Sequence, residues 1–152
     1  MPPPSEFLQA RDNFIISTDK HRLDLDVIHE FLARSYWAAG ISRETVACSI
    51  QNSLCFGIYR NDQQVGFARV ISDQATFAYL ADVFVLEAFR GTGLSKWLMQ
   101  CIIEHPNLQG LRRWVLGTRD AHGLYAQFGF KPLSSPEIFM EIHNGDVYRK
   151  RA

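Results

Sequence analysis

The sequence contains little that would indicate a secreted or membrane-bound protein. Only three of its 152 residues are cysteines, Cys48, Cys55 and Cys101, and they form no C-x-x-C pair. This odd number and spacing favour buried or free thiols in a reducing compartment over disulfides or zinc ligands. No apolar run approaches the roughly 18 residues of a membrane span, and the opening Met-Pro-Pro-Pro does not resemble a signal peptide. We therefore expect a cytoplasmic protein with no membrane partner.

An excess of charge of one sign is also missing. Sixteen lysines and arginines balance sixteen aspartates and glutamates, so the formal net charge is zero. Such a chain has no field that attracts nucleic acid. The five histidines show no ligand spacing, which predicts no metal. The length fits one domain over residues 1–152, with residues 1–12 as a loose proline-rich leader.

The sequence does contain a strand, a glycine turn and a helix start in immediate succession. Val83 and Val85 alternate as in a strand, Arg90-Gly91-Thr92-Gly93 follows, and helical spacing begins at Leu94. Glycines let the backbone approach a ligand, and the first amides of a helix have no internal partner. The helix dipole adds partial positive charge there. The unit therefore predicts a site for a phosphate or pyrophosphate.

The spacing of this loop narrows the class of ligand. No G-x-x-x-x-G-K-[ST] is present, and Lys96 stands where the third glycine of a dinucleotide fingerprint belongs. The loop resembles instead the acyl-CoA pyrophosphate loop of the GNAT superfamily of N-acetyltransferases, R-G-x-G-[ILV]-[GA], with Ser95 in the last place. By this resemblance, the residues assigned to acetyl-CoA are Phe84, Val85, Arg90, Gly91, Thr92, Gly93, Leu94 and Ser95.

A second motif lies downstream, over residues 118–130. It is similar to the GNAT pattern N-x-x-A-x-x-L-Y-x-x-x-G-F, with Thr118 in place of the usual asparagine. Because two separate motifs occur in the expected order, the chain is identified as a member of the GNAT superfamily. The matching positions are Ala121, Leu124, Tyr125, Gly129 and Phe130.

The resemblance implies an α+β GNAT fold, with a central mixed sheet of about six to seven strands flanked by about four helices. We expect the sheet to be antiparallel early and parallel after the long helix crosses over. Residue patterns predict strands at 14–17, 53–60, 65–71, 75–86, 114–116 and 138–142, and helices at 25–37, from 42, at 94–104 and at 121–127.

The chemistry of acetyl transfer assigns further roles. An alkyl ammonium loses a proton before it attacks, the oxyanion needs a preorganised donor, and an acid can protonate the leaving thiolate. The resemblance makes Tyr125 the acid and a backbone N–H near Phe84 or Val85 the oxyanion donor. Small-amine enzymes of the superfamily often carry Glu-Asp where this chain has Ala81-Asp82. Asp82 either deprotonates or orients the amine, or it satisfies the backbone at a strand bulge.

The acceptor is less well defined by the sequence. Arg34 or Arg69 can hold a carboxylate, and Tyr36 and Trp37 can stack on a substrate or simply pack in the core. We favour an acetyl-CoA-dependent transferase that acetylates a primary amine of a small molecule by direct attack in a ternary complex. The alternatives are the same chemistry on a protein or peptide amine, or a non-catalytic CoA-binding module. A homodimer is plausible for this superfamily.

Overall fold

The computed structural model describes residues 7–149 and has an α+β fold built on a six-stranded sheet in the order β1-β2-β3-β4-β5-β6. Neighbouring strands are antiparallel from β1 to β5, and β6 is parallel to β5. The predicted change from antiparallel to parallel pairing is therefore confirmed. The strands are β1 (Leu8–Arg11), β2 (Phe14–Ser17), β3 (Leu54–Arg60), β4 (Gln63–Ser72), β5 (Phe77–Val85) and β6 (Arg113–Leu116).

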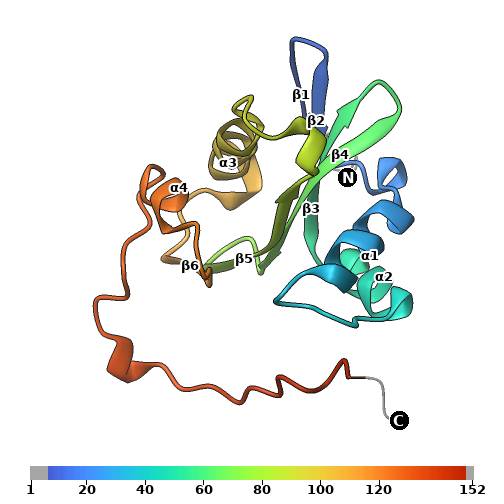
Figure 1. Cartoon of the computed structure of the whole chain (residues 1–152). Helices are drawn as coiled ribbons and strands as arrows, with labels where there is room; N and C mark the ends of the chain where they lie inside the picture. Colours follow the sequence, from blue (N-terminus) through green and yellow to red (C-terminus); the bar gives the residue numbers. More distant parts are fainter. Residues whose placement is uncertain (1–6, 150–152) are drawn as a thin grey trace, which may run out of the picture.

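Four α-helices cover the sheet, α1 and α2 on one face and α3 and α4 on the other (Figure 1). The helix starts follow from the sequence: Asp24 accepts hydrogen bonds from the amides of Asp26 and Val27, and Ser42 accepts one from the amide of Thr45. These side chains satisfy amides that the first helical turn leaves free. The helices are α1 (Leu25–Arg34), α2 (Arg43–Gln51), α3 (Leu94–Glu104) and α4 (His122–Ala126).

Each face of the sheet has its own apolar core. Phe56, Leu98 and Ile102 are fully buried between the sheet and α3, and Ile28 and Phe67 are fully buried beneath α1 and α2. Burying one such side chain contributes about 1.5–3 kcal/mol. Because both faces are packed in this way, the central strands form a rigid support for the residues at the end of β5.

Two predictions about the ends of the chain are wrong. The prediction of a loose leader over residues 1–12 is wrong for residues 8–11, which form β1 and pair with β2 from Leu8↔Ser17 to Arg11↔Phe14. Residues 1–6 lie outside the described residues. The strand predicted over 138–142 does not form. The chain leaves the sheet after β6 and does not return to it. Pro136, which lacks an amide hydrogen, opens the 3-10 turn η4 (Pro136–Ile138), and the chain continues from there as an extended arm outside the sheet (Figure 1).

Helix α1 ends earlier than its apolar spacing predicts. Ser35 takes an extended conformation with ψ 157°, and its hydroxyl donates to the carbonyl of Leu32 and accepts from the amide of Ala38. A serine that bonds local backbone in this way competes with helix continuation. As a result, Tyr36 and Trp37 lie in a turn outside the helix.

Two further features bear on the sequence analysis. Cys55 and Cys101 are buried, Cys48 is exposed, and all three are unbridged. Within residues 7–149, no helix is both long enough and apolar enough to cross a membrane.

Candidate active site

A cleft opens where β5 and β6 separate. The two strands pair in parallel only from Phe77↔Arg113 to Leu80↔Leu116, and β6 ends there while β5 continues to Val85. The backbone of residues 81–85 therefore has no β6 partner on that side. The resulting cleft has a volume of about 740 Å³. In open sheets with parallel strands, ligands bind at the carboxyl ends of the strands, as this opening would allow.

The glycine loop borders the cleft at the start of α3. Gly91 and Gly93 both have φ +82°, and Gly93 is the N-cap of α3 without a side-chain cap. The first amides of α3 are therefore free to bind an anion. Two side chains of the loop bond its backbone: Arg90 Nε donates to the carbonyl of Val85 over 2.9 Å, and Thr92 Oγ1 donates to the carbonyl of Phe89 over 3.1 Å.

The glycine loop and the cleft adjoin each other. A second hollow of about 210 Å³ lies over the loop, and Val85, Arg90 and Ser95 line both it and the cleft. A Cβ built on Gly91 would meet no atom within 4 Å, so the space above this backbone is open. Of the eight residues predicted for the cofactor, Thr92 is the one that lines neither hollow.

Tyr125 lies on α4 and lines the cleft. It is 9% exposed, and its ring contacts that of Phe130 edge-on at 6.0 Å. Its hydroxyl takes part in none of the hydrogen bonds found within residues 7–149, and the residue faces the cleft, where a substrate can reach it. Burial raises the pKa of Tyr125 above its ordinary value, with smaller contributions from Tyr36 and Asp120. The phenol therefore stays protonated at neutral pH and can donate a proton.

Asp82 lies at the bulge where the β4–β5 register shifts, and its backbone has φ +55°. Both of its carboxylate oxygens are occupied: Oδ1 accepts from Trp37 Nε1 over 2.8 Å, and Oδ2 accepts from Arg69 Nε over 2.8 Å. The side chains of Arg69 and Asp82 are 16% and 9% exposed. Arg69 Nη1 also donates to Ser53 Oγ. Of the two interpretations left open by the sequence, this geometry fits a structural role better than that of a free base.

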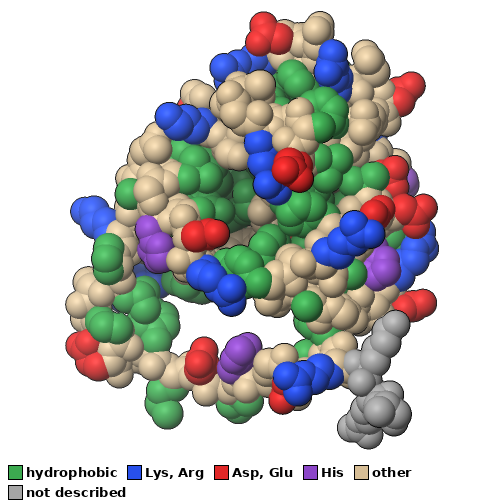
Figure 2. Space-filling model, viewed as in Figure 1, with side chains coloured by type: hydrophobic (Ala, Val, Ile, Leu, Met, Phe, Trp, Pro, Cys, Tyr) green, Lys and Arg blue, Asp and Glu red, His purple; other side chains and the backbone are tan. Residues whose placement is uncertain are grey.

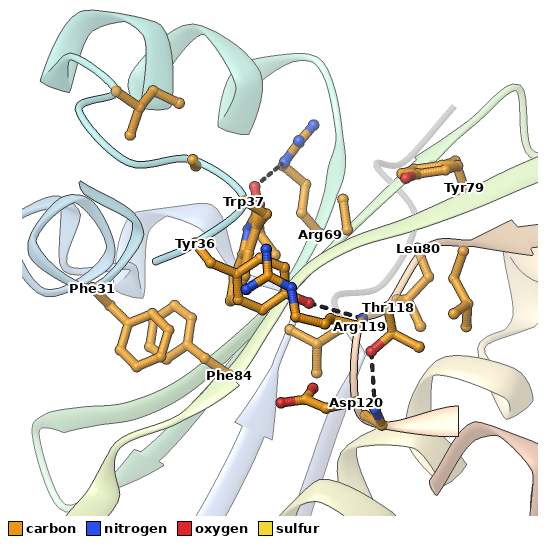
Figure 3. A pocket seen from close by; sticks show the side chains of 18 of the residues that line it. Phe31, Tyr36, Trp37, Arg69, Tyr79, Leu80, Phe84, Thr118, Arg119 and Asp120 are labelled. Atoms are coloured by element: carbon orange, nitrogen blue, oxygen red, sulfur yellow. Dashed lines mark hydrogen bonds and ion pairs between the residues drawn. The ribbon is translucent and has the colours of Figure 1, made fainter. Parts of the chain in front are cut away.

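The far end of the cleft is formed by two connecting segments that meet. The hydroxyl of Tyr36 accepts from the amide of Arg119 over 3.0 Å, and the Arg119 guanidinium lies 4.0 Å from the centre of the Tyr36 ring (Figure 3). Tyr36 and Trp37 contact each other edge-on at 5.1 Å and are 47% and 41% exposed. Neither aromatic residue is buried in the core, so both are available to a substrate.

The structure does not bring Arg34 to this cleft. Its side chain is 80% exposed and pairs with Glu30 one helical turn away. Sequence reasoning missed Arg119 and Asp120, which line the cleft together with His143 and Tyr148. Arg119 and Asp120 could have been found from the sequence, because both lie inside the second motif, residues 118–130. Thr118 Oγ1 accepts from the amide of Ala121 over 3.1 Å, so this replacement for asparagine still supports the turn before α4.

Within the described part of the chain, no group of three or more His, Cys, Asp or Glu side chains is arranged to hold a metal ion.

Comparison with known proteins identifies the fold and the motifs. The family model of the acetyltransferase (GNAT) domain matches residues 51–132. A protein of Gibberella zeae that bears the name of an acetyltransferase is 31% identical over 141 residues, covering 78% of each chain. A crystal structure from Xanthomonas campestris pv. campestris, described as a GNAT-family acetyltransferase, is 48% identical, has a TM-score of 0.90, and is matched over 93% of this chain and 100% of its own.

A more distant likeness shows the fold alone. The structure of an acetyltransferase from Clostridium acetobutylicum with acetyl-CoA has a TM-score of 0.61 at 14% identity, over 86% of this chain and 95% of its own.

Proposed function

Because the chain belongs to the GNAT family of acetyltransferases, we propose that it transfers the acetyl group of acetyl-CoA to a primary amine of a small molecule, with both substrates bound together. One observation carries this proposal. A single cleft between β5 and β6 is lined by Ser95 at the start of α3, by the buried Tyr125, and by Tyr36 and Trp37 at its far end. An acyl donor entering at the glycine loop and an amine entering at the aromatic end would meet beside Tyr125.

Binding of the donor is supported by backbone groups. The free amides at the start of α3 would hold the pyrophosphate, helped by the partial positive charge of the helix end. The unpaired backbone of residues 81–85 would bond the amide groups of the pantetheine arm as a neighbouring strand does. Leu94 is nearly buried and fixes the first turn of α3 against the core. The complex of a distant structural neighbour with acetyl-CoA agrees with this choice of donor.

The transfer itself requires an oxyanion donor and an acid. A backbone N–H at Phe84 or Val85 would stabilise the charge that develops on the carbonyl oxygen as the amine nitrogen bonds to the acetyl carbon. As the carbon–sulfur bond breaks, Tyr125 would donate its phenolic proton to the leaving thiolate. The amine gives up its protons to water in the open cleft, and Tyr125 is reprotonated from the same water. Asp82 holds Trp37 and Arg69 in place and is not needed as a base in this scheme.

The size and charge of the far end support a small acceptor. The whole cleft has a volume of about 740 Å³, within the range of small-molecule sites, about 300–1,000 Å³, and the pantetheine arm would take up part of it. His143 and Tyr148 of the C-terminal arm line the same cleft, on a side where a long peptide would need room. Arg119 and Asp120 offer opposite charges there, which suits an amine that also carries an anionic group. Arg69 cannot fill that role because Asp82 neutralises it.

The proposal is tested by measuring CoA release from acetyl-CoA across a panel of amines, amino acids and short peptides. We expect turnover with a small amine and a fall in kcat of about 10²–10³ in Tyr125→Phe, since a positioned acid contributes about 10²–10⁴. In the wild type, kcat should not fall with rising pH until above the ordinary tyrosine value of 10.0, because burial raises the pKa of Tyr125.

The matched control is Tyr59→Phe, which removes the hydroxyl of another buried tyrosine that does not line the cleft. Equal losses in the two variants would contradict the role of Tyr125. Turnover on peptides alone would favour a protein substrate, and binding of acetyl-CoA without any turnover would favour a non-catalytic module.

A further inference from the structure

The cleft contains one carboxylate that the protein does not use for its own contacts. The acidic side chains that line the cleft are Asp82 and Asp120. Asp82 accepts hydrogen bonds from Trp37 and Arg69 with its two oxygens. The Asp120 carboxylate takes part in none of the hydrogen bonds and ion pairs found within residues 7–149. Both of its oxygens are therefore open to a substrate or to water.

The start of α4 places Asp120 beside Tyr125. Ala121 is the N-cap of α4, so Asp120 holds the position before the cap and Tyr125 the fourth position of the helix. Side chains at these two positions pack together in many helices, because the entering chain runs over the first turn. The amide of Tyr125 donates to the carbonyl of Ala121 over 3.3 Å, so this turn is formed here. Both residues line the cleft, which makes them neighbours at its inner wall.

The helix and the neighbouring cation leave the Asp120 carboxylate uncommitted. Aspartate often caps a helix start, but the Ala121 amide donates to Thr118 Oγ1 instead. The Arg119 guanidinium covers the Tyr36 ring, 4.0 Å from its centre. Figure 3 shows both side chains of the loop extending into the cleft, with the Asp120 carboxylate apart from the guanidinium. A structural role for this carboxylate is thus not apparent from its contacts.

The environments of Tyr125 and Asp120 favour opposite protonation states. Burial raises the pKa of Tyr125, and the charges of Tyr36 and Asp120 raise it further, so the phenol keeps its proton. Asp120 is exposed, and its carboxylate is negatively charged at neutral pH. Two neighbouring groups of this kind can supply an acid and a base at the same pH.

The proposed reaction moves one proton from the amine nitrogen to the sulfur. We propose that Asp120 is the general base for this proton, a role that rests on the proposed function. The neutral amine donates its lone pair to the acetyl carbon, and the nitrogen becomes positively charged. Asp120 then removes a proton from the nitrogen. The carbon–sulfur bond breaks, its electron pair leaves with the sulfur, and Tyr125 protonates the thiolate.

Solvent at the acceptor end of the cleft restores both groups. His143 and Tyr148 of the C-terminal arm line the cleft, and Figure 2 shows an open gap between the arm and the rest of the molecule. Water that enters there takes the proton from Asp120 and returns one to Tyr125. The two groups thus regain their starting states after each turnover, with no net gain or loss of protons.

The first experiment needs no acceptor. NMR of protein with isotope-labelled tyrosine Cζ follows the titration of Tyr125, whose signal is the one missing in Tyr125→Phe. Asp120→Asn should lower the pKa of Tyr125, because a nearby negative charge is removed. The matched control is Asp62→Asn, which removes an exposed carboxylate outside the cleft, between β3 and β4, and should leave this titration unchanged. An unchanged Tyr125 titration in Asp120→Asn overturns the proposal.

The second experiment uses the amine of the panel that is turned over fastest. Asp120→Ala should fold normally by circular dichroism and lose about 10²–10³ in kcat, with the KM for acetyl-CoA unchanged. Formate should restore turnover of Asp120→Ala in proportion to its concentration, because this small carboxylate can take the proton in place of the missing side chain. Tyr125→Phe lacks the acid and should gain no turnover from formate.

Three kinetic results would contradict the role of Asp120. A raised KM for the amine with unchanged kcat would make Asp120 a binding residue. Equal effects of formate on Asp120→Ala and Tyr125→Phe would show that the rescue is not specific. A loss of kcat in His143→Gln but not in Asp120→Ala would make His143 the base. A wild type that turns over no amine would refute the proposed function, and the NMR titration would still decide whether Asp120 and Tyr125 form a pair.

Discussion

The two halves of the cleft are formed by different parts of the chain, backbone groups in one half and side chains in the other. The half proposed to bind the donor, here the donor half, consists of backbone: the unpaired edge of β5, the left-handed glycines and the first amides of α3. The half proposed to bind the amine, here the acceptor half, consists of side chains from segments far apart in the sequence, such as Tyr36 and Arg119, which are 83 residues apart. Backbone geometry needs only a short local motif, whereas a side-chain pocket depends on how distant connections meet. The donor half is thus suited to one constant ligand, whereas single substitutions in the acceptor half can change which ligand it binds.

The largest effect of a substitution on stability is expected at Asp82, where the two halves of the cleft are joined. Removing one partner of a buried ion pair costs about 3–5 kcal/mol, because the other charge stays buried. Asp82→Ala should therefore lower the free energy of unfolding by about 3 kcal/mol and raise the acceptor KM, since Trp37 loses its hydrogen bond. Denaturant unfolding and steady-state kinetics measure the two effects.

The matched variant Asp82→Asn keeps an oxygen for Trp37 and tolerates the positive φ. If Asp82 only positions its neighbours, this variant should retain the acid limb of the pH–rate profile. Disappearance of that limb in Asp82→Asn would instead establish Asp82 as a base.

The backbone nature of the donor half is tested at Gly91. Gly91→Ala forces a side chain into φ +82°, which costs about 1–2 kcal/mol, and it places a methyl group on the backbone that faces the donor. Gly110→Ala is the control, because Gly110 also has positive φ, 71°, and open space around it. Both variants should lose similar stability, but Gly91→Ala alone should bind acetyl-CoA more weakly, by about tenfold, in calorimetry. Equal affinities would show that the loop does not bind the donor.

The difference between the halves also explains what the sequence could predict. Gly91, Gly93 and Tyr125 belong to short motifs, and all three line the hollows where those motifs place them. Arg34 does not line the cleft because its side chain is exposed and pairs with Glu30 on α1, which a linear pattern does not reveal. Arg119 was missed because its contact with Tyr36 depends on two loops meeting.

The strand predicted over 138–142 failed for a related reason. Its alternation of apolar residues is genuine, as the exposed fractions of Met140 and Ile142 show. A strand forms only against a partner, however, and within residues 7–149 this segment has none. An alternating sequence pattern indicates which side chains can pack on one face of a strand, but it does not indicate which partner that face packs against.

The side-chain nature of the acceptor half is tested at Arg119. Arg119→Met keeps most of the volume over Tyr36 but removes the charge, so the KM for an acceptor with an anionic group should rise about tenfold, equivalent to about 1.4 kcal/mol. Arg34→Met makes the same change on the exposed pair with Glu30 and should leave kinetics unchanged. The KM for acetyl-CoA should stay within twofold in both. An effect on the donor KM equal to that on the acceptor KM would erase the distinction between the two halves.

The smallest effect is expected at Tyr59, which lies outside both halves. Its hydroxyl is the one buried side-chain polar atom without a hydrogen-bond partner within residues 7–149, and burial raises its pKa above the ordinary value. Tyr59→Phe removes this hydroxyl but keeps the ring beneath the Arg22 guanidinium. The unfolding free energy should therefore stay equal or rise by up to about 1 kcal/mol near neutral pH.

The raised pKa of Tyr59 also makes the stability of the protein depend on pH. The folded protein holds the Tyr59 proton more tightly than the unfolded chain, so this contribution to stability is complete below pH 10 and is lost as the pH rises toward the folded pKa. Denaturant unfolding at pH 8 and at pH 10.5 should consequently show a steeper loss in the wild type than in Tyr59→Phe. An equal loss in the two proteins would mean that the hydroxyl has a partner, such as bound water, and that the core tolerates its ionisation.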